Sequence, residues 1–229
     1  MKKYSILFGS LLATALAINA PQASAFGISS LTSAIPGVSG GAASSNVSAA
    51  DIDVFIKTAQ DADAMIASST DYIFRALADK ADIEKYEAGM AQARTIADPK
   101  EQQAAIDKIK DDEVTATQKQ LASADIQQKL NGMSKEKLKA FGNAAFTYML
   151  GVLKDKQLAD GSRALVTGVA ANPVLVGRLA ALKDVVSSVS SQAVNTAKIG
   201  DGLVKIASAG KVITLPTSSS DKAKAVATF

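Results

Sequence analysis

A serine and a lysine three residues apart are the strongest chemical signal in this chain. Ser134 and Lys137 have the spacing that, on one helical turn, sets a lysine amine beside the nucleophile of serine acyl-transfer enzymes. Those enzymes also need Ser-Asp-Asn and Lys-Thr-Gly elements and a β-sheet, whereas this sequence has no Lys-Thr-Gly and almost no strand-forming segment. We therefore interpret Ser134 as a helix N-cap, and the same spacing at Ser219 and Lys222 as part of the C-terminal tail.

Acidic residues form two Asp-x-Asp pairs that could, in principle, supply oxygen ligands to a divalent cation. The pairs are Asp51 with Asp53 and Asp61 with Asp63, and a third acidic run occupies 111–113. Residues two apart on a helix do not face the same way, so neither pair can chelate as a unit. We expect solvated helix faces here and no metal site.

The chain contains neither histidine nor cysteine. It therefore lacks imidazole, the usual general base and metal ligand, and it cannot be held together by disulfides. The string Gly200-Asp201-Gly202 follows no strand, so we interpret it as a helix break and not as a nucleotide loop. The sequence thus predicts a non-enzymatic protein without a cofactor.

The N-terminus has the pattern of a secretory signal peptide. Lys2 and Lys3 precede an uncharged apolar run, and small residues at 23–25 form a cleavage site before Phe26. We expect an exported protein, periplasmic or secreted, with a signal peptide at 1–25 and a flexible Gly/Ser/Ala-rich segment at 26–47. A single helical bundle domain should occupy 48–210 and a loose tail 211–229.

Hydrophobic periodicity predicts the helices of that domain. The first begins at Ser48, which suits an N-cap, and carries an apolar stripe of Ile52, Phe55, Ala59, Ala62, Ile66, Ile73 and Leu77. A second helix is expected over 79–97, and Pro99 should start a third, polar outer helix that reaches residue 130. Ser134 caps a fourth. We expect an all-α fold, a bundle of four to six helices with a disordered N-terminal leader and C-terminal tail.

Two uncharged segments, 140–153 and 164–177, stand out in the second half of the chain. A charged connection at 154–163 joins them, and Pro173 should break the second. Runs of this length usually form buried helices, because a membrane span needs roughly 20 apolar residues. The alternative is a helical hairpin that leaves the bundle and enters a bilayer.

Seven residues in or next to these segments are the candidate apolar contacts for a ligand or partner: Phe141, Phe146, Tyr148, Met149, Leu153, Leu175 and Leu179. The leading hypothesis is an exported binding module of the cell envelope that engages a lipid, an apolar small molecule or an envelope protein. The alternatives are a structural or assembly protein that acts through helix-helix self-association, as a homo-oligomer, and a membrane-acting protein with peripheral membrane contact.

Charge is distributed unevenly along the chain. Residues 51–130 contain 16 acidic and 10 basic side chains, whereas 131–229 contain 13 basic and 6 acidic ones. The oppositely charged halves could attract each other in the fold, or the basic half could face an anionic lipid or another polyanion. Nucleic acid is not an expected partner, because the chain has no arginine cluster and few aromatic residues.

Overall fold

Six α-helices dominate the computed structural model, which describes residues 47–210 and 213–226 but not the side chains of 190, 191, 193–195 and 210. The elements are α2 (Ala49–Leu77), α3 (Lys80–Arg94), α4 (Pro99–Leu121), α5 (Ile126–Asn131), α6 (Lys135–Ala171), the 3-10 turn η1 (Val176–Arg178) and α7 (Leu179–Gly210). No strand occurs in these two ranges, so the expected all-α bundle is confirmed. The predicted signal peptide 1–25 and nearly all of 26–47 lie outside the described residues.

The helix boundaries follow from local chemistry that the sequence displays. Ser48 and Asp51 form a reciprocal capping box at the start of α2, with Ser48 N donating to Asp51 Oδ2 over 2.8 Å. Asp98 caps α4 and Pro99 occupies its first position. Ser134 accepts from Lys137 N over 3.2 Å and caps α6. These N-caps satisfy backbone donors that would otherwise lack a partner.

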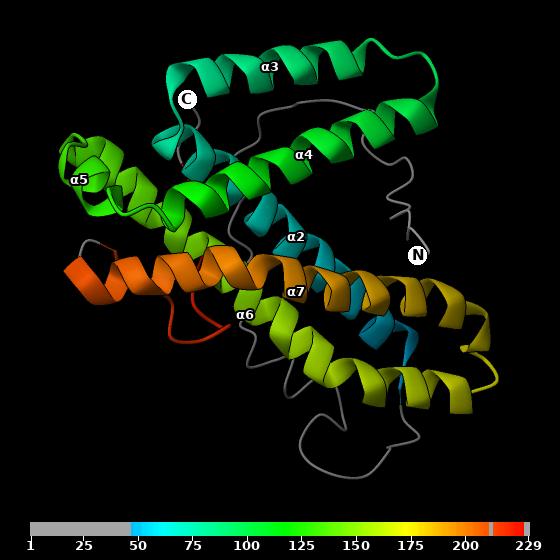
Figure 1. The fold of residues 1–229 in the computed structure, drawn as a ribbon. Helices are drawn as coiled ribbons and strands as arrows, with labels where there is room; N and C mark the ends of the chain where they lie inside the picture. Colours follow the sequence, from blue (N-terminus) through cyan, green and yellow to red (C-terminus); the bar gives the residue numbers. More distant parts are fainter. Residues whose placement is uncertain (1–46, 211–212, 227–229) are drawn as a thin grey trace.

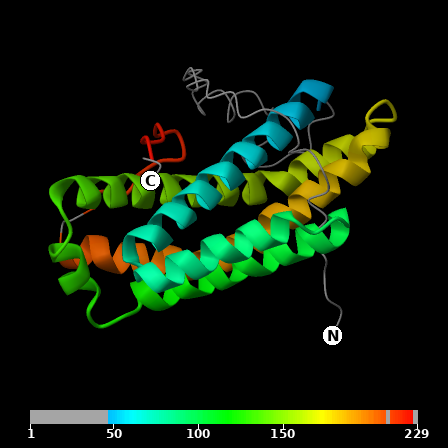
Figure 2. The ribbon, with the colours of Figure 1, turned by 90° about the horizontal axis from the view of Figure 1, so that it is seen from above.

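Three long helices form the centre of the molecule. α2 and α7 both pack against α6, and both run antiparallel to it (Figure 1). α3 and α4 form a second antiparallel pair, which lies over the C-terminal half of α2, and α4 also contacts α7 (Figure 2). α4 buries only Glu113, Thr117 and Leu121, as expected for a polar outer helix.

The core consists of two apolar clusters, one toward each end of the three-helix unit. The first, near α5, contains residues from α2, α4, α5, α6, α7 and the tail, with Ile73, Leu130, Phe141, Tyr148 and Leu203 fully buried. The second joins the N-terminal half of α2 to the far ends of α6 and α7, and it contains Ile52, Phe55, Leu165, Val169 and Leu182. Burial of these side chains is the main favourable contribution to the fold.

The prediction of a connection at 154–163 is wrong. α6 continues through this segment, so the uncharged segments 140–153 and 164–177 lie mostly end to end on one helix and do not form a hairpin. The charged residues at 154, 156, 160 and 163 are half-buried or exposed, whereas Leu158 and Leu165 face the core. An amphipathic helix crosses the segment because its charges fall largely on one side.

Two further helix boundaries also differ from the sequence prediction. α7 continues through Gly200 and Gly202, and both glycines are buried. At Gly202 the helix lies so close to α4 that a Cβ atom there would be only 2.9 Å from Leu121 Cβ. These glycines therefore serve close helix packing and not a break. The predicted third helix ends at Leu121, and the separate short helix α5 follows. The helix break at Pro173 is confirmed, since α6 ends at Ala171.

Residues 213–226 of the tail contain no helix and lie along α6. Thr147 Oγ1 donates to Lys224 O over 2.9 Å and accepts from Lys224 N over 3.2 Å. Asn143 Nδ2 donates to Ala225 O over 3.1 Å, and Ile213 is buried in the first apolar cluster. The tail is therefore attached to α6 at several points.

Candidate functional site

A pocket of about 320 Å³ lies between the first turns of α6 and the tail. We call it the lysine pocket, because three of its eight lining residues are lysines. Its wall is formed by Lys135, Leu138, Lys139, Gly142 and Asn143 of α6 and by Ile213, Thr214 and Lys224 of the tail. The α6 residues recur every three or four positions, so they share one helix face. The pocket thus combines apolar side chains with three lysines.

The tail fixes the third lysine of the pocket. Both backbone hydrogen bonds of Lys224 involve Thr147, one turn beyond Asn143 on α6. Its Nζ lies 4.1 Å from the centroid of the Phe146 ring, a cation-π contact that keeps the side chain against α6. Lys224 is therefore held beside Lys135 and Lys139 although 85 residues separate Lys139 from it in sequence.

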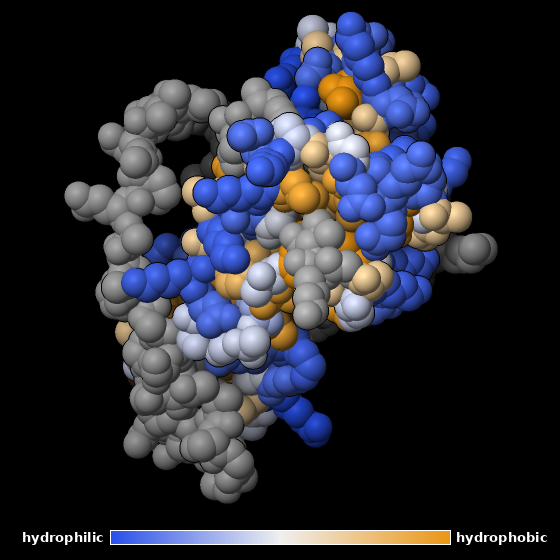
Figure 3. Space-filling model, turned by 90° about the vertical axis from the view of Figure 1, so that its left-hand side faces the viewer, coloured by the Kyte–Doolittle hydropathy of each residue, from blue (hydrophilic) through white to orange (hydrophobic). Residues whose placement is uncertain are grey.

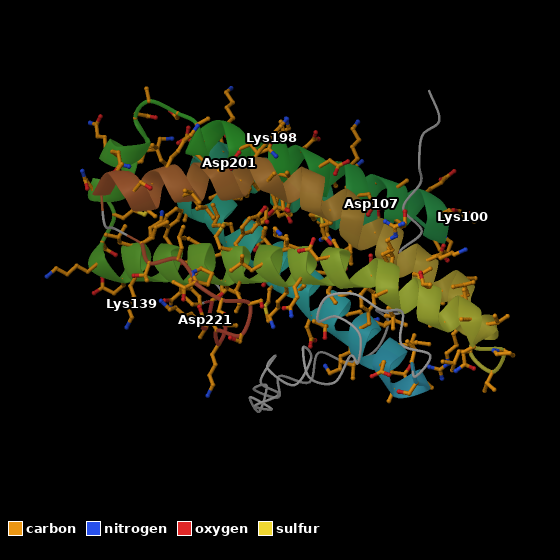
Figure 4. All side chains as sticks on the ribbon, turned by 90° about the horizontal axis from the view of Figure 1, so that it is seen from below. Lys100, Asp107, Lys139, Lys198, Asp201 and Asp221 are labelled. Atoms are coloured by element: carbon orange, nitrogen blue, oxygen red, sulfur yellow. The ribbon has the colours of Figure 1, made fainter. Side chains whose placement is uncertain are left out.

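The pocket lysines have no anionic partner among residues 47–210 and 213–226, where none of them enters an ion pair. The nearby tail carboxylate, Asp221, accepts instead from Thr217 N and Ser218 N over 2.9 and 3.2 Å. Lys139 and Asp221 lie on one side of α6, whereas Lys100 and Lys198 lie on the opposite side (Figure 4). The carboxylate nearest to the pocket is thus held by the backbone of the tail, and the pocket lysines are left without an ion pair within the described residues.

One of the pocket lysines also stands where helix stability alone disfavours it. Lys135 and Lys137 occupy the first turn of α6, at the positive end of the helix macrodipole, together with the favourably placed Glu136. A cation there costs about 0.3–1 kcal/mol at an exposed position. A bound anion would relieve this repulsion.

A second unusual feature, the polar layer, lies between the two apolar clusters. It consists of Asp63 of α2, Asp155 of α6 and Gln192 of α7. Asp155 is 0 % exposed, and neither of its carboxyl oxygens has a hydrogen-bond partner among the described groups. Asp63 Oδ1 and Gln192 Oε1 are likewise buried and unpartnered, although Gln192 makes a side-chain hydrogen bond to Asp63.

Burial changes the acidity of this layer. Desolvation, together with the negative charge of Asp63, raises the pKa of Asp155 to about 7. Desolvation also raises the pKa of Asp63 to about 6, and the hydrogen bond from Gln192 partly offsets this. Burial lowers the pKa of the neighbouring Lys154, while Asp61 raises it. Both carboxyl groups therefore change charge near neutral pH.

Glu113 of α4 is a further buried acid, separate from the polar layer. Burial first, and then the charge of Asp71, raise its pKa to about 7, and the Tyr86 hydroxyl partly offsets this through a hydrogen bond. Arg75 lies 5.6 Å from the centroid of the Tyr86 ring and pairs with Glu87 and with Asp71, the latter at 3.1 Å. This cluster fastens α2 to α3 and α4.

The seven candidate apolar contacts do not form one surface. Phe141, Phe146, Tyr148 and Leu175 are buried, and Met149, Leu153 and Leu179 are half-buried. Phe141, Tyr148 and Met149 belong to the first apolar cluster, whereas Leu175 and Leu179 belong to the second. Among the large apolar residues of the segment 164–177, Val174 and Val176 near its end are exposed, at 89 % and 49 %.

The other sequence motifs have structural roles. Ser134 is the N-cap of α6, as interpreted, and Ser219 donates to Gln157 Oε1 over 2.7 Å. The Asp-x-Asp pairs separate, as their spacing predicts: Asp53 pairs with Arg178 at 2.6 Å and Asp61 with Lys57 at 3.2 Å. Within the described residues, no group of three or more acidic side chains is placed to hold a metal ion.

Sequence reasoning missed both the lysine pocket and the polar layer. Asp155 lies seven residues after Tyr148 and three before Leu158, a spacing that places it on the buried face once α6 is continuous. The signal for the burial of Asp155 was therefore present, but not the signal for its meeting with Asp63. For the pocket, the spacing of Lys135 and Lys139 shows one face of α6, but no local pattern places Lys224 beside it.

The surface near the lysine pocket is mostly hydrophilic. Seen from the α5 end, charged and polar residues cover most of the visible described surface, and hydrophobic residues appear between them (Figure 3). No described helix combines the length and hydropathy that a membrane span requires.

Comparison of the chain with protein families, curated proteins and solved structures finds no match.

Proposed function

We propose that the protein is an exported, non-enzymatic binding module that holds a small anionic amphiphile in the lysine pocket. The observation that carries the proposal is the convergence of Lys135, Lys139 and Lys224 around apolar side chains, with no ion pair to any of the three within the described residues. An anionic head group would contact the lysines, and an apolar chain would contact Leu138 and Ile213. A ligand with a carboxylate or phosphate on an acyl chain has this chemistry.

The size and charge of the pocket agree with such a ligand. Small-molecule pockets have volumes of roughly 300–1,000 Å³, so a pocket of about 320 Å³ suits a small ligand. Ion pairs with partly exposed lysines contribute about 0.2–1 kcal/mol each. Three such pairs would therefore strengthen binding by roughly threefold to a hundredfold over an uncharged analogue.

Isothermal titration calorimetry with decanoate tests the binding step. The wild-type protein should bind decanoate with one-to-one stoichiometry, and decanol should bind at least about threefold more weakly. Replacing Lys135, Lys139 and Lys224 with Gln should weaken decanoate binding at least about threefold. A matched triple variant, K100Q/K108Q/K198Q, loses the same charge at exposed positions on α4 and α7 and should bind like wild type.

Two results would reject the pocket. One is equal loss of affinity in both triple variants, since the effect would then be one of net charge. The other is wild-type affinity in the K135Q/K139Q/K224Q variant.

Sedimentation with anionic vesicles distinguishes a free ligand from a lipid of a membrane surface, because the protein should co-sediment with the vesicles only in the second case. Mass measurement of the protein from its host tests export: the mature chain should begin at Phe26.

A further inference from the structure

The polar layer divides the hydrophobic core at the same level on all three central helices. On α2, Asp63 lies between Ala59 of one apolar cluster and Ile66 of the other. On α6, Asp155 lies between Tyr148 and Leu158, and on α7, Gln192 lies between Val189 and Ile199. The helices are therefore held together by apolar contacts above and below a level at which acids meet.

No cation among the described side chains neutralises this layer. From α2 the layer contains Asp63, from α6 it contains Asp155 and the neighbouring hydroxyl of Tyr148, and from α7 it contains the neutral Gln192. Two lysines adjoin Asp155 in sequence: Lys154 interacts with Asp61, and Lys156 pairs with Asp160 at 3.1 Å. Tyr148 donates its hydroxyl hydrogen to Thr196 O over 3.0 Å and so supplies no donor to Asp155.

We infer that the polar layer is a pH-dependent switch. When Asp63 and Asp155 are neutral, α7 stays packed on α2 and α6, and when both acids ionise, the N-terminal half of α7 loosens. Two buried charges of the same sign repel each other strongly in a medium of low dielectric constant. Hydrating them requires water to enter the α2–α6–α7 seam. The half-exposed Asp63 marks the side from which water can enter.

α7 is the helix that should move, because its N-terminal half is weakly anchored. Between Leu179 and Val189 only Leu182 and Val189 are buried, whereas the C-terminal half buries Ile199, Gly200, Gly202, Leu203 and Ile206. One ion pair, Arg178 with Asp53 at 2.6 Å, fastens the beginning of this half to α2, and it is exposed. The anchored half can thus serve as the fixed end of the motion.

The direction of the pH effect follows from the raised pKa values. Asp63 and Asp155 bind protons more tightly in the closed state than in an open, hydrated one, so proton release favours opening. The closed state is favoured at pH 5, and it loses stability as the pH rises through about 6 and then about 7, the pKa values of the two acids.

Distances between pairs of spin labels, measured by double electron-electron resonance, test this inference on the full chain. The chain has no cysteine, so a pair of introduced cysteines can be labelled uniquely. Q60C/S187C places labels at exposed positions on α2 and on the N-terminal half of α7. T115C/D201C places them at exposed positions on α4 and the C-terminal half of α7, as the matched control pair.

The labels at 60 and 187 should give a narrow distribution at pH 5 and a longer, broader one at pH 8.5, while those at 115 and 201 stay unchanged. The D63N/D155N variant should give the narrow distribution at both pH values. E113Q, which removes a buried acid outside the layer, should respond like the wild type. An unchanged wild-type distribution, or an equal response in D63N/D155N, overturns the inference.

A second measurement covers the case in which D63N/D155N does not fold. D63N alone removes the repulsion but leaves Asp155 ionisable, so the labels at 60 and 187 should respond less than in the wild type. In the E113Q background, the unfolding equilibrium constant should rise between pH 5 and pH 8.5. This rise should be at least about tenfold larger in the protein that keeps Asp63 than in the protein that also carries D63N. Equal responses with and without D63N overturn the inference.

Discussion

Gly151 provides the sharpest test of how the central helices pack. It lies on α6 where α2 approaches, and a Cβ atom there would be 2.8 Å from Ile66 Cγ1 and 3.0 Å from Ala62 O. The second contact is with helical backbone, which cannot move unless α2 moves. Gly151→Ala should therefore destabilise the protein, because the two helices must separate or Ile66 must leave its rotamer.

The magnitude follows from two opposing effects. Ala is better than Gly in a helix interior by about 1 kcal/mol, and overpacking a close contact costs about 1–3 kcal/mol. Since the contact with Ile66 Cγ1 is too short to persist and the one with Ala62 O is tight against backbone, we expect the upper part of that range and a net loss of about 1–2 kcal/mol. For a domain of this size, that loss lowers Tm by roughly 2–8 °C.

Gly89→Ala is the matched control on α3. A Cβ atom at Gly89 would meet Ile109 Cδ1 at 3.5 Å, which is an ordinary contact, so the helix-propensity gain should remain. We expect Gly89→Ala to stabilise the protein by about 0.5–1 kcal/mol. Urea denaturation followed by circular dichroism at 222 nm gives both values in one assay.

A double-mutant cycle checks the cause. I66A removes the side chain that a methyl group at residue 151 would strike, although Ala62 O remains. The G151A/I66A protein should therefore lose less stability than the sum of the two single variants. If Gly151→Ala is as stable as wild type, or if the two losses simply add, the close approach of α2 and α6 is not what requires glycine there.

Two further predictions concern other elements. Ser48→Ala removes the hydroxyl of the capping box on α2 and should cost about 1 kcal/mol, while Ser48→Asp should restore most of that loss; urea denaturation measures both. A Ser48→Ala protein of wild-type stability would show that the box contributes nothing. Glu113→Gln should stabilise the protein at pH 8 by about 1–3 kcal/mol and leave it unchanged at pH 4, because burial raises the pKa of Glu113 to about 7 and its ionised form opposes folding above that pH. Thermal unfolding at the two pH values gives the comparison, and an equal effect at both would contradict it.

The sequence determined the helical character and most helix ends, because these depend on neighbouring residues. The stripe from Ile52 to Leu77 identified the buried face of α2, and Ser48, Pro99 and Ser134 identified three helix starts. These signals are local: a side chain caps the backbone within three residues, and helical periodicity repeats within one turn. The lack of imidazole groups and of disulfide bonds likewise follows from composition alone.

Only the tertiary structure decided how α6, α7 and the tail are used. The charged segment 154–163 and the glycines at 200 and 202 resemble interruptions, yet packing against α2 and α4 makes both continuous helix. The pKa of Asp155 is raised only because the surrounding helices exclude water from it and because the negative charge of Asp63, 92 residues earlier, lies close to it. Lys224 joins Lys139 only because the tail returns to α6. Contacts of this range depend on the whole chain, and no local pattern encodes them.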